Sequence, residues 1–153
     1  MTIAYVGIGS NLDDPRTQVL NAFSELDRLP HTRLVKRSSL YRTAPMGHAD
    51  QPDFINAVAQ LETGLPAERL LTELQAVEAR HGRRRSFPNA PRTLDLDILL
   101  FGNATMQSTA LTLPHPRMHE RAFVLKPLLE IAPDLGFKKQ LDSCKGQKVE
   151  RLD

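Results

Sequence analysis

The feature that most limits how this chain can fold is an alternating strand pattern in residues 94–101. Residues two apart in a strand share a face, so Asp95 and Asp97 are expected side by side. We expect such an apolar strand inside a sheet, where two neighbouring carboxylates are costly unless a cation meets both. A divalent ion such as Mg²⁺, held by carboxylates and substrate phosphates, fits that need; the alternative is an edge strand with two solvated aspartates. The opposite face would carry Leu94, Leu96, Ile98 and Leu100.

An arginine-rich segment leads into this strand. Because arginine binds phosphate through a planar fork of donors, a cluster beside two aspartates indicates a small polyanion as ligand. The formal net charge is only +2, which does not favour a general nucleic-acid binder. The alternative is that residues 82–90 form a solvated basic loop. Five arginines fall within thirteen positions: Arg80, Arg83, Arg84, Arg85 and Arg92.

Hydrophobic periodicity predicts the order strand, helix, strand, strand, helix, strand. This order is the split β-α-β motif of ferredoxin-like α+β domains. Asp14 is expected to cap the first helix, and Pro15 to take its first position. The expected strands are residues 3–8, 32–41, 54–61 and the aspartate strand, and the expected amphipathic helices are residues 15–28 and 66–82.

The C-terminal third is less clearly patterned. A third helix is expected from residue 116 or 117, with Pro127 kinking or breaking it. Arg121 and Phe123 are two residues apart, so on a helix they would share a face only if the backbone were irregular there. Beyond residue 133 two outcomes are open: a short strand and a terminal helix around Leu141, or fraying.

Length and composition indicate one domain over residues 1–153, with 41% hydrophobic and 25% charged residues. Cys144 is the single cysteine, so no intrachain disulfide can form. No stretch approaches the roughly 20 apolar residues of a membrane span, and Met1–Ser10 lacks the features of a signal peptide. We therefore expect a cytoplasmic protein, a monomer that binds neither nucleic acid nor membranes.

A few single positions are ambiguous when taken alone. Phe54 and Asn56 share a strand face, so they would either stack on and hydrogen-bond a flat heterocycle or serve as core and edge residues. His81 on an apolar stripe is interpreted as a packed helix-end residue rather than a ligand. His115 lies between two prolines and is interpreted as functional, with a turn histidine as the alternative. The Gly-x-Gly at residues 7–9 lacks the third glycine of a dinucleotide loop and is interpreted as a tight strand exit.

Five blocks, in order along the chain, resemble one family. The run Ala90–Leu100 looks like the signature of 6-hydroxymethyl-7,8-dihydropterin pyrophosphokinase, an enzyme family of folate biosynthesis. The similarity extends from residue 3 to about 134. The chain departs from the family at Pro88, Asn89 and Ala110, where a basic, an aromatic and an arginine residue occur in other members, and its loop 82–91 is one residue shorter than in some. The other matching blocks are Tyr5–Leu12, Ser39–Pro45, Gln51–Asn56 and Leu113–Met118.

This resemblance implies a three-layer α/β/α fold, an antiparallel ferredoxin-like sheet with helices on both faces. It also implies transfer of pyrophosphate from ATP to the hydroxymethyl group of 6-hydroxymethyl-7,8-dihydropterin, with release of AMP. Two Mg²⁺ ions would bind the ATP phosphates and Asp95 and Asp97. Catalytic roles would fall to these aspartates and to Arg83, Arg85 and Arg92, of which the first two arginines would close over ATP.

The resemblance further implies two sets of substrate-binding residues. The pterin ring would lie between two phenylalanine rings, with its edge hydrogen-bonded by an amide and a hydroxyl. This pterin set would be Thr43, Ala44, Met46, Phe54, Asn56 and Phe123. The ATP set would be Gln75, Glu78, Arg83, Arg85, Arg92, Thr112, His115 and Arg121.

Two other classes of protein fit individual features. A metal-dependent nucleotidyl transferase would also use Asp-x-Asp, but it would release pyrophosphate rather than AMP. A non-catalytic ferredoxin-like domain would bind RNA through its sheet and the arginine loop. That class usually carries paired aromatics on central strands, and this chain has only 5% aromatic residues. Neither class explains the five ordered blocks.

Overall fold

In the computed structural model, which describes residues 1–45, 50–82 and 93–152, the main sheet has six antiparallel strands. Their order is β5-β1-β4-β3-β8, and β2 also pairs with β4. A separate two-stranded sheet is formed by β6 (Met106–Gln107) and β7 (Thr112–Leu113). The strands of the main sheet are β1 (Thr2–Ser10), β2 (Thr32–Arg37), β3 (Tyr41–Thr43), β4 (Phe54–Thr63), β5 (Asp95–Phe101) and β8 (Val149–Arg151).

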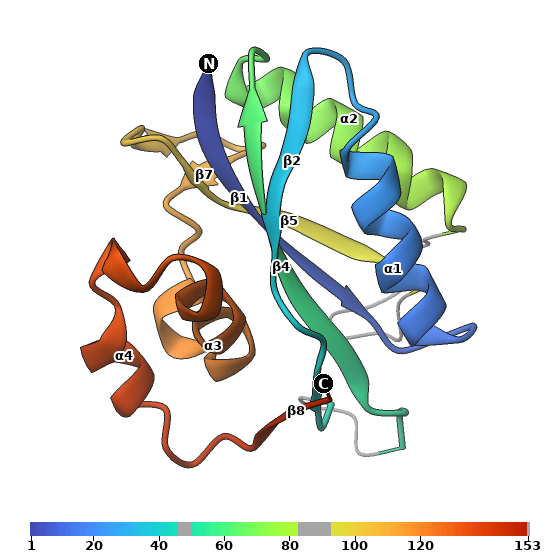
Figure 1. The fold of residues 1–153 in the computed structure, drawn as a ribbon, viewed down its shortest axis with the longest axis vertical. Helices are drawn as coiled ribbons and strands as arrows, with labels where there is room; N and C mark the ends of the chain where they lie inside the picture. The colour runs from blue at the N-terminus through green and yellow to red at the C-terminus, as the bar shows by residue number, and fades with distance from the viewer. Residues whose placement is uncertain (46–49, 83–92, 153) are drawn as a thin grey trace.

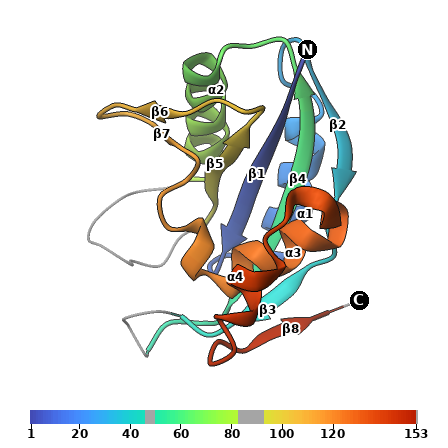
Figure 2. The ribbon, with the colours of Figure 1, turned by 90° about the vertical axis from the view of Figure 1, so that its left-hand side faces the viewer.

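Helices cover both faces of this sheet. Figure 1 shows α1 (Pro15–Leu26) and α2 (Ala67–Arg80) on one side and α3 (Ala122–Ile131) and α4 (Lys138–Asp142) on the other. Figure 2 gives the same arrangement from the α3 side. In the strand order, β5 lies beside β1, β1 beside β4, and β4 beside β2 and β3, as in a ferredoxin-like domain. The predicted three-layer α+β fold is confirmed.

Two apolar clusters lie on the two faces of the sheet because side chains alternate along each strand. The larger cluster joins the sheet to α1 and α2, with Val6 of β1 and Leu61 of β4 fully buried. The smaller joins it to α3, with Val58 and Leu125 fully buried. No helix in the described ranges is long and apolar enough to cross a membrane.

The aspartate strand β5 differs from its prediction in two ways. It lies at the end of the sheet formed by the described residues, so the edge position of the alternative is correct, although its two aspartates are half-buried rather than solvated. The alternation is confirmed as far as Ile98, but a bulge opposite the Tyr5–Val6 step then shifts the register. Leu99 and Leu100 therefore both face the α3 cluster, and the prediction for Leu100 is wrong.

The strand predicted at residues 32–41 is two strands, β2 and β3, that both pair with β4. Ser38 interrupts it: its backbone N–H donates to the Val58 carbonyl (2.9 Å), and its Oγ accepts from the Val58 N–H (2.9 Å). The Ser38 side chain thus takes the place of a main-chain carbonyl as the acceptor for the Val58 N–H, so the regular pairing of the strand ends there.

Helix ends also depart from expectation. Asp14 precedes α1 in a left-handed conformation, and its carboxylate accepts from the Thr17 hydroxyl (2.8 Å) rather than capping a backbone N–H. The predicted helix from residue 116 or 117 is instead a short 3-10 helix, Met118–Glu120, followed by α3. Pro127 was expected to kink or break the helix; it does not break it, since α3 continues through it.

The segment after residue 133 is ordered, so the fraying alternative is wrong. It forms α4 around Leu141, and its last strand, β8, pairs with β3. The other alternative, a short strand and a helix around Leu141, is confirmed, except that the strand follows the helix and the helix is not terminal.

Candidate active site

Two pockets meet beside the aspartate strand. The first, of about 100 Å³, lies on the α3 side of the sheet over β1, β4 and β5. The second, of about 590 Å³, lies around the edge of the sheet between α2, β5 and the β6–β7 turn. Asp97 and His115 line both pockets, so a molecule in one would adjoin a molecule in the other.

The floor of the first pocket is made of small residues. Gly7 and Gly9 both lie inside β1 and line the pocket, so their interpretation as a strand exit is wrong. A Cβ at Gly9 would approach the Asn56 Oδ1 to 3.1 Å, which is tighter than most real Cβ contacts. Glycine here leaves room for the amide of the neighbouring strand. The Gly-x-Gly pattern is visible in the sequence, but its cause, the Asn56 amide, lies on a neighbouring strand and cannot be recognised from the local sequence.

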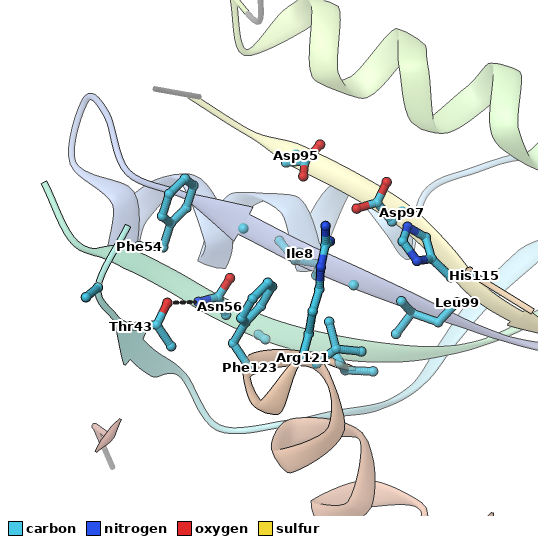
Figure 3. A pocket seen from close by; sticks show the side chains of 16 residues that line it. Ile8, Thr43, Phe54, Asn56, Asp95, Asp97, Leu99, His115, Arg121 and Phe123 are labelled. Atoms are coloured by element: carbon cyan, nitrogen blue, oxygen red, sulfur yellow. Dashed lines mark hydrogen bonds between the residues drawn. The ribbon is translucent and has the colours of Figure 1, made fainter. Parts of the chain in front are cut away.

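A polar pair and two aromatic rings define the rest of the first pocket. The buried Asn56 Nδ2 donates to the Thr43 Oγ1 (2.8 Å), which leaves the Asn56 Oδ1 as an acceptor beside the cavity. Phe54 of β4 and Phe123 at the start of α3 both point into the pocket, as Figure 3 shows. The predicted pterin residues within the described ranges, including Ala44, are therefore brought together.

Arg121 and Phe123 both reach the first pocket, although two residues on a regular helix would not share a face. Arg121 precedes α3 in an extended conformation, so the backbone is irregular between them, as that prediction required. The guanidinium carbon lies 5.5 Å from the centroid of the Phe123 ring. Figure 3 shows this side chain extending towards Asp97 and His115.

Asp95 and Asp97 are half-buried, and both face the first pocket, so their predicted shared face is confirmed. The start of β5 is tied down on two sides. Ser10 Oγ donates a short hydrogen bond to the Thr93 carbonyl, and the buried Glu78 carboxylate accepts from the Leu96 N–H (2.8 Å). Glu78 thus satisfies an edge donor of β5 between the two aspartates.

His115 lies at the junction of the two pockets, in contact with both. Its backbone N–H donates to the Leu99 carbonyl (2.9 Å), which attaches it to the bulge of β5. Burial lowers the pKa of His115 below its ordinary value of 6.5, and the charges of Arg121 and Arg117 lower it further against the opposing charge of Asp95. The Arg117 N–H donates to its Nδ1 (3.2 Å), so in the neutral ring Nε2 carries the proton.

The second pocket gathers most of the predicted ATP set that is described. Gln75 and Glu78 come from α2, and Thr112 comes from β7. The turn between β6 and β7 also lines it, and this contribution was missed because the segment shows little patterning. Ala110, where other family members carry arginine, is in that turn and exposed.

Several predicted residues lie outside the described ranges: Met46, Arg83, Arg85 and Arg92, together with Pro88 and Asn89. Their roles stay predictions. His81, just before that segment, bonds Gln18 and Glu25 of α1 through its two ring nitrogens. The interpretation of His81 as a packed helix-end residue is confirmed.

The fold and site together define a class: a ferredoxin-like α+β protein with two adjoining pockets that share an aspartate. The profile of the family described as 7,8-dihydro-6-hydroxymethylpterin-pyrophosphokinase (HPPK) matches residues 5–133. The chain therefore belongs to the HPPK family.

Relatives and solved structures agree with this assignment. The chain is 48% identical over 154 residues to 2-amino-4-hydroxy-6-hydroxymethyldihydropteridine pyrophosphokinase of Pseudomonas aeruginosa, covering 97% of this chain and 95% of that one. It is 50% identical over 135 residues to the Haemophilus influenzae protein of the same name, covering 88% and 84%. A crystal structure of Plasmodium falciparum HPPK-DHPS shares the fold, with a TM-score of 0.67 and 13% identity over 94% of this chain; the chain spans 43% of that longer one.

Proposed function

We propose that this chain transfers pyrophosphate from ATP to the hydroxymethyl group of 6-hydroxymethyl-7,8-dihydropterin in folate biosynthesis, releasing AMP. Its family membership and the names of its relatives support this activity. The observation that carries the proposal is the pair of unequal pockets meeting at Asp97 and His115. The first would hold the flat pterin between Phe54 and Phe123, and the second would hold ATP.

The aspartate pair fits Mg²⁺. Two carboxylates from one strand supply hard oxygen ligands, and Mg²⁺ in phosphate-transfer sites takes its remaining ligands from substrate phosphates and water. Asp95 and Asp97 would hold two such ions, which would neutralise the charge that develops on the phosphate oxygens.

The chain itself would act mainly by positioning, since phosphoryl transfer needs little covalent chemistry from the protein. Asn56 Oδ1 offers an acceptor to the heterocycle edge, and the neutral His115 offers its Nε2–H to a phosphate oxygen. Arg121 brings a permanent positive charge to the junction. The hydroxymethyl oxygen would attack the β-phosphorus, the bond from that phosphorus to the AMP oxygen would break, and the hydroxyl proton would pass to solvent.

Other properties stay predictions. The cytoplasmic location and the monomeric state rest on sequence alone. The loop arginines Arg83, Arg85 and Arg92 are expected to surround ATP, as the family resemblance implies.

A product assay tests the proposal. The chain is incubated with 6-hydroxymethyl-7,8-dihydropterin, ATP and Mg²⁺, and the products are separated by chromatography. We expect one AMP for each pterin pyrophosphate, and neither without Mg²⁺. Release of pyrophosphate with a nucleotidylated pterin would favour the nucleotidyl transferase alternative, and absence of any pterin product would overturn the proposal.

A further inference from the structure

A single carboxylate joins three elements on the α3 side of the sheet. Glu130, near the end of α3, accepts from the Tyr41 hydroxyl (2.6 Å) and from both the N–H (3.0 Å) and the hydroxyl (3.0 Å) of Ser39. It also forms an ion pair with Arg151 of β8 (3.5 Å). The Glu130 side chain is only 23% exposed, so these contacts are partly shielded from water.

The elements that Glu130 joins carry two different sides of the first pocket. Phe123 and Glu130 are seven residues apart, about two turns, and so lie on the same side of α3. Tyr41 and Thr43 are two residues apart in β3, so their side chains lie on the same face of that strand. The start of α3 thus carries the Phe123 ring, and its end carries Glu130, which contacts the strand that bears Thr43.

Strand β8 completes the support of β3. Thr43 lies opposite Phe54 of β4 on one side and Val149 of β8 on the other. Lys126 Nζ of α3 donates to the Val149 carbonyl (3.2 Å), which gives a second link between the helix and β8. Figure 2 shows β8 beside β3 below α3. In the described part of the chain, β4 and β8 are the strands that pair with the three-residue strand β3.

The surroundings of the Glu130 carboxylate favour its ionised form. Burial would raise the pKa of Glu130, but the hydrogen bonds from Tyr41 and Ser39 and the charge of Arg151 outweigh it and hold the pKa below its ordinary value. Burial raises the pKa of Tyr41, and its bond to the Glu130 carboxylate raises it further. At neutral pH the carboxylate is therefore ionised and the tyrosine keeps its proton.

We propose that Glu130 is a positioning residue for the pterin: through Tyr41, Ser39 and β8 it sets the spacing between the Phe123 wall and the Thr43–Asn56 wall. This inference rests on the proposed function for the identity of the ligand. It gives the C-terminal strand a role in substrate binding, although no residue of β8 lines either pocket in the described part of the chain.

The test compares Glu130→Gln with Glu150→Gln. Glu150, on β8, forms an exposed ion pair with Arg42 of β3 (3.7 Å), so its variant removes a charge from the same strand pair without touching α3. Calorimetry measures the Kd of 6-hydroxymethylpterin with a saturating non-hydrolysable ATP analogue and Mg²⁺, and separately the Kd of the analogue. Hydrogen exchange of Tyr41–Thr43 is followed in the free proteins.

We expect Glu130→Gln to weaken pterin binding at least fivefold, to leave the Kd of the ATP analogue within twofold, and to speed exchange of Tyr41–Thr43 at least fivefold. Glu150→Gln should change none of these. Tyr41→Phe, which keeps the carboxylate, should reproduce the split at smaller size and serves if Glu130→Gln folds poorly. Equal losses for both ligands, or unchanged pterin affinity, would overturn the inference. A wild-type protein that binds no pterin would refute the proposed function instead, and the exchange rates would still decide whether Glu130 holds β3.

Discussion

The two pockets are built from different parts of the fold. The first has its floor on the inner strands β1 and β4, and its polar pair, Asn56 and Thr43, is buried. The second lies at the edge of the sheet, where α2, β5 and a short hairpin leave a much wider space. A small pocket over inner strands suits a rigid ring recognised by shape, whereas a wide edge pocket suits a flexible, charged ligand. Among the described residues, the two pockets share only Asp97 and His115.

The largest effect is expected where the pockets meet. Asp97→Asn removes a charge that faces both pockets, and Asp95→Asn removes its neighbour. We expect each variant to lose about 3–4 kcal/mol of transition-state stabilisation, or roughly a 100- to 1,000-fold fall in kcat, with little change in thermal stability. Steady-state kinetics and thermal unfolding measure this.

The matched control is Asp134→Asn, an exposed aspartate that lines neither pocket. Its activity should equal that of the wild type. Near-normal turnover in both site variants would mean that the junction of the pockets is not where the chemistry takes place.

The second prediction separates the pockets. Phe123→Ala removes one wall of the first pocket and nothing that lines the second. Loss of a stacking ring is expected to cost about 2 kcal/mol of pterin affinity, or roughly 30-fold in Kd, with the Kd of ATP unchanged. Phe137→Ala is the control, because Phe137 packs in the α3 cluster against His119 without lining a pocket. Equal losses for pterin and ATP would contradict the division into two binding sites.

A smaller effect tests the floor of the first pocket. Gly9→Ala would place a Cβ 3.1 Å from the Asn56 Oδ1, whereas Gly7→Ala would place one in ordinary contact, 3.4 Å, with the flexible Leu99 side chain. We expect Gly9→Ala to weaken pterin binding severalfold and Gly7→Ala to weaken it less. The opposite order in calorimetric titrations would mean that the Asn56 amide is not held against the floor.

The smallest predicted effect is a shift of the His115 titration. Because its pKa is below 6.5 in the folded protein, this group destabilises the fold as pH falls from 6.5 through that lower value. In the metal-free protein, NMR should show Arg121→Gln raising the His115 pKa, Arg117→Gln raising it less, and Asp95→Asn lowering it. An unchanged midpoint in Arg121→Gln would show that the Arg121 charge does not reach the junction.

Local pattern was enough to predict the elements whose cause is local. Alternation placed Asp95 with Asp97 and Phe54 with Asn56, and both pairs share a face in the structure. It failed at Leu100, because Leu99, Leu100 and Phe101 are all apolar and a bulge among them changes no residue type. It failed at Ser38 because the hydrogen bonds that end β2 go to Val58, twenty residues away.

The site shows the same division. Thr43, Gln75 and Phe123 carry no pattern of their own, and only resemblance to a family singled them out. Gly9 was misinterpreted because its reason is an amide on the adjacent strand. A short strand beyond residue 133 was one of two open alternatives, but its pairing with β3 could not be predicted, because this contact joins residues more than one hundred positions apart in the sequence.

The most direct measurement follows one phosphorus atom across the junction of the pockets. ATP labelled in its β-phosphate is incubated with 6-hydroxymethyl-7,8-dihydropterin, Mg²⁺ and the protein, and the label is located after one turnover. If the pterin oxygen attacks the β-phosphorus beside Asp97, all transferred label is in the pterin pyrophosphate and none is in nucleotide product. Label in ADP, or in free pyrophosphate, would contradict the account.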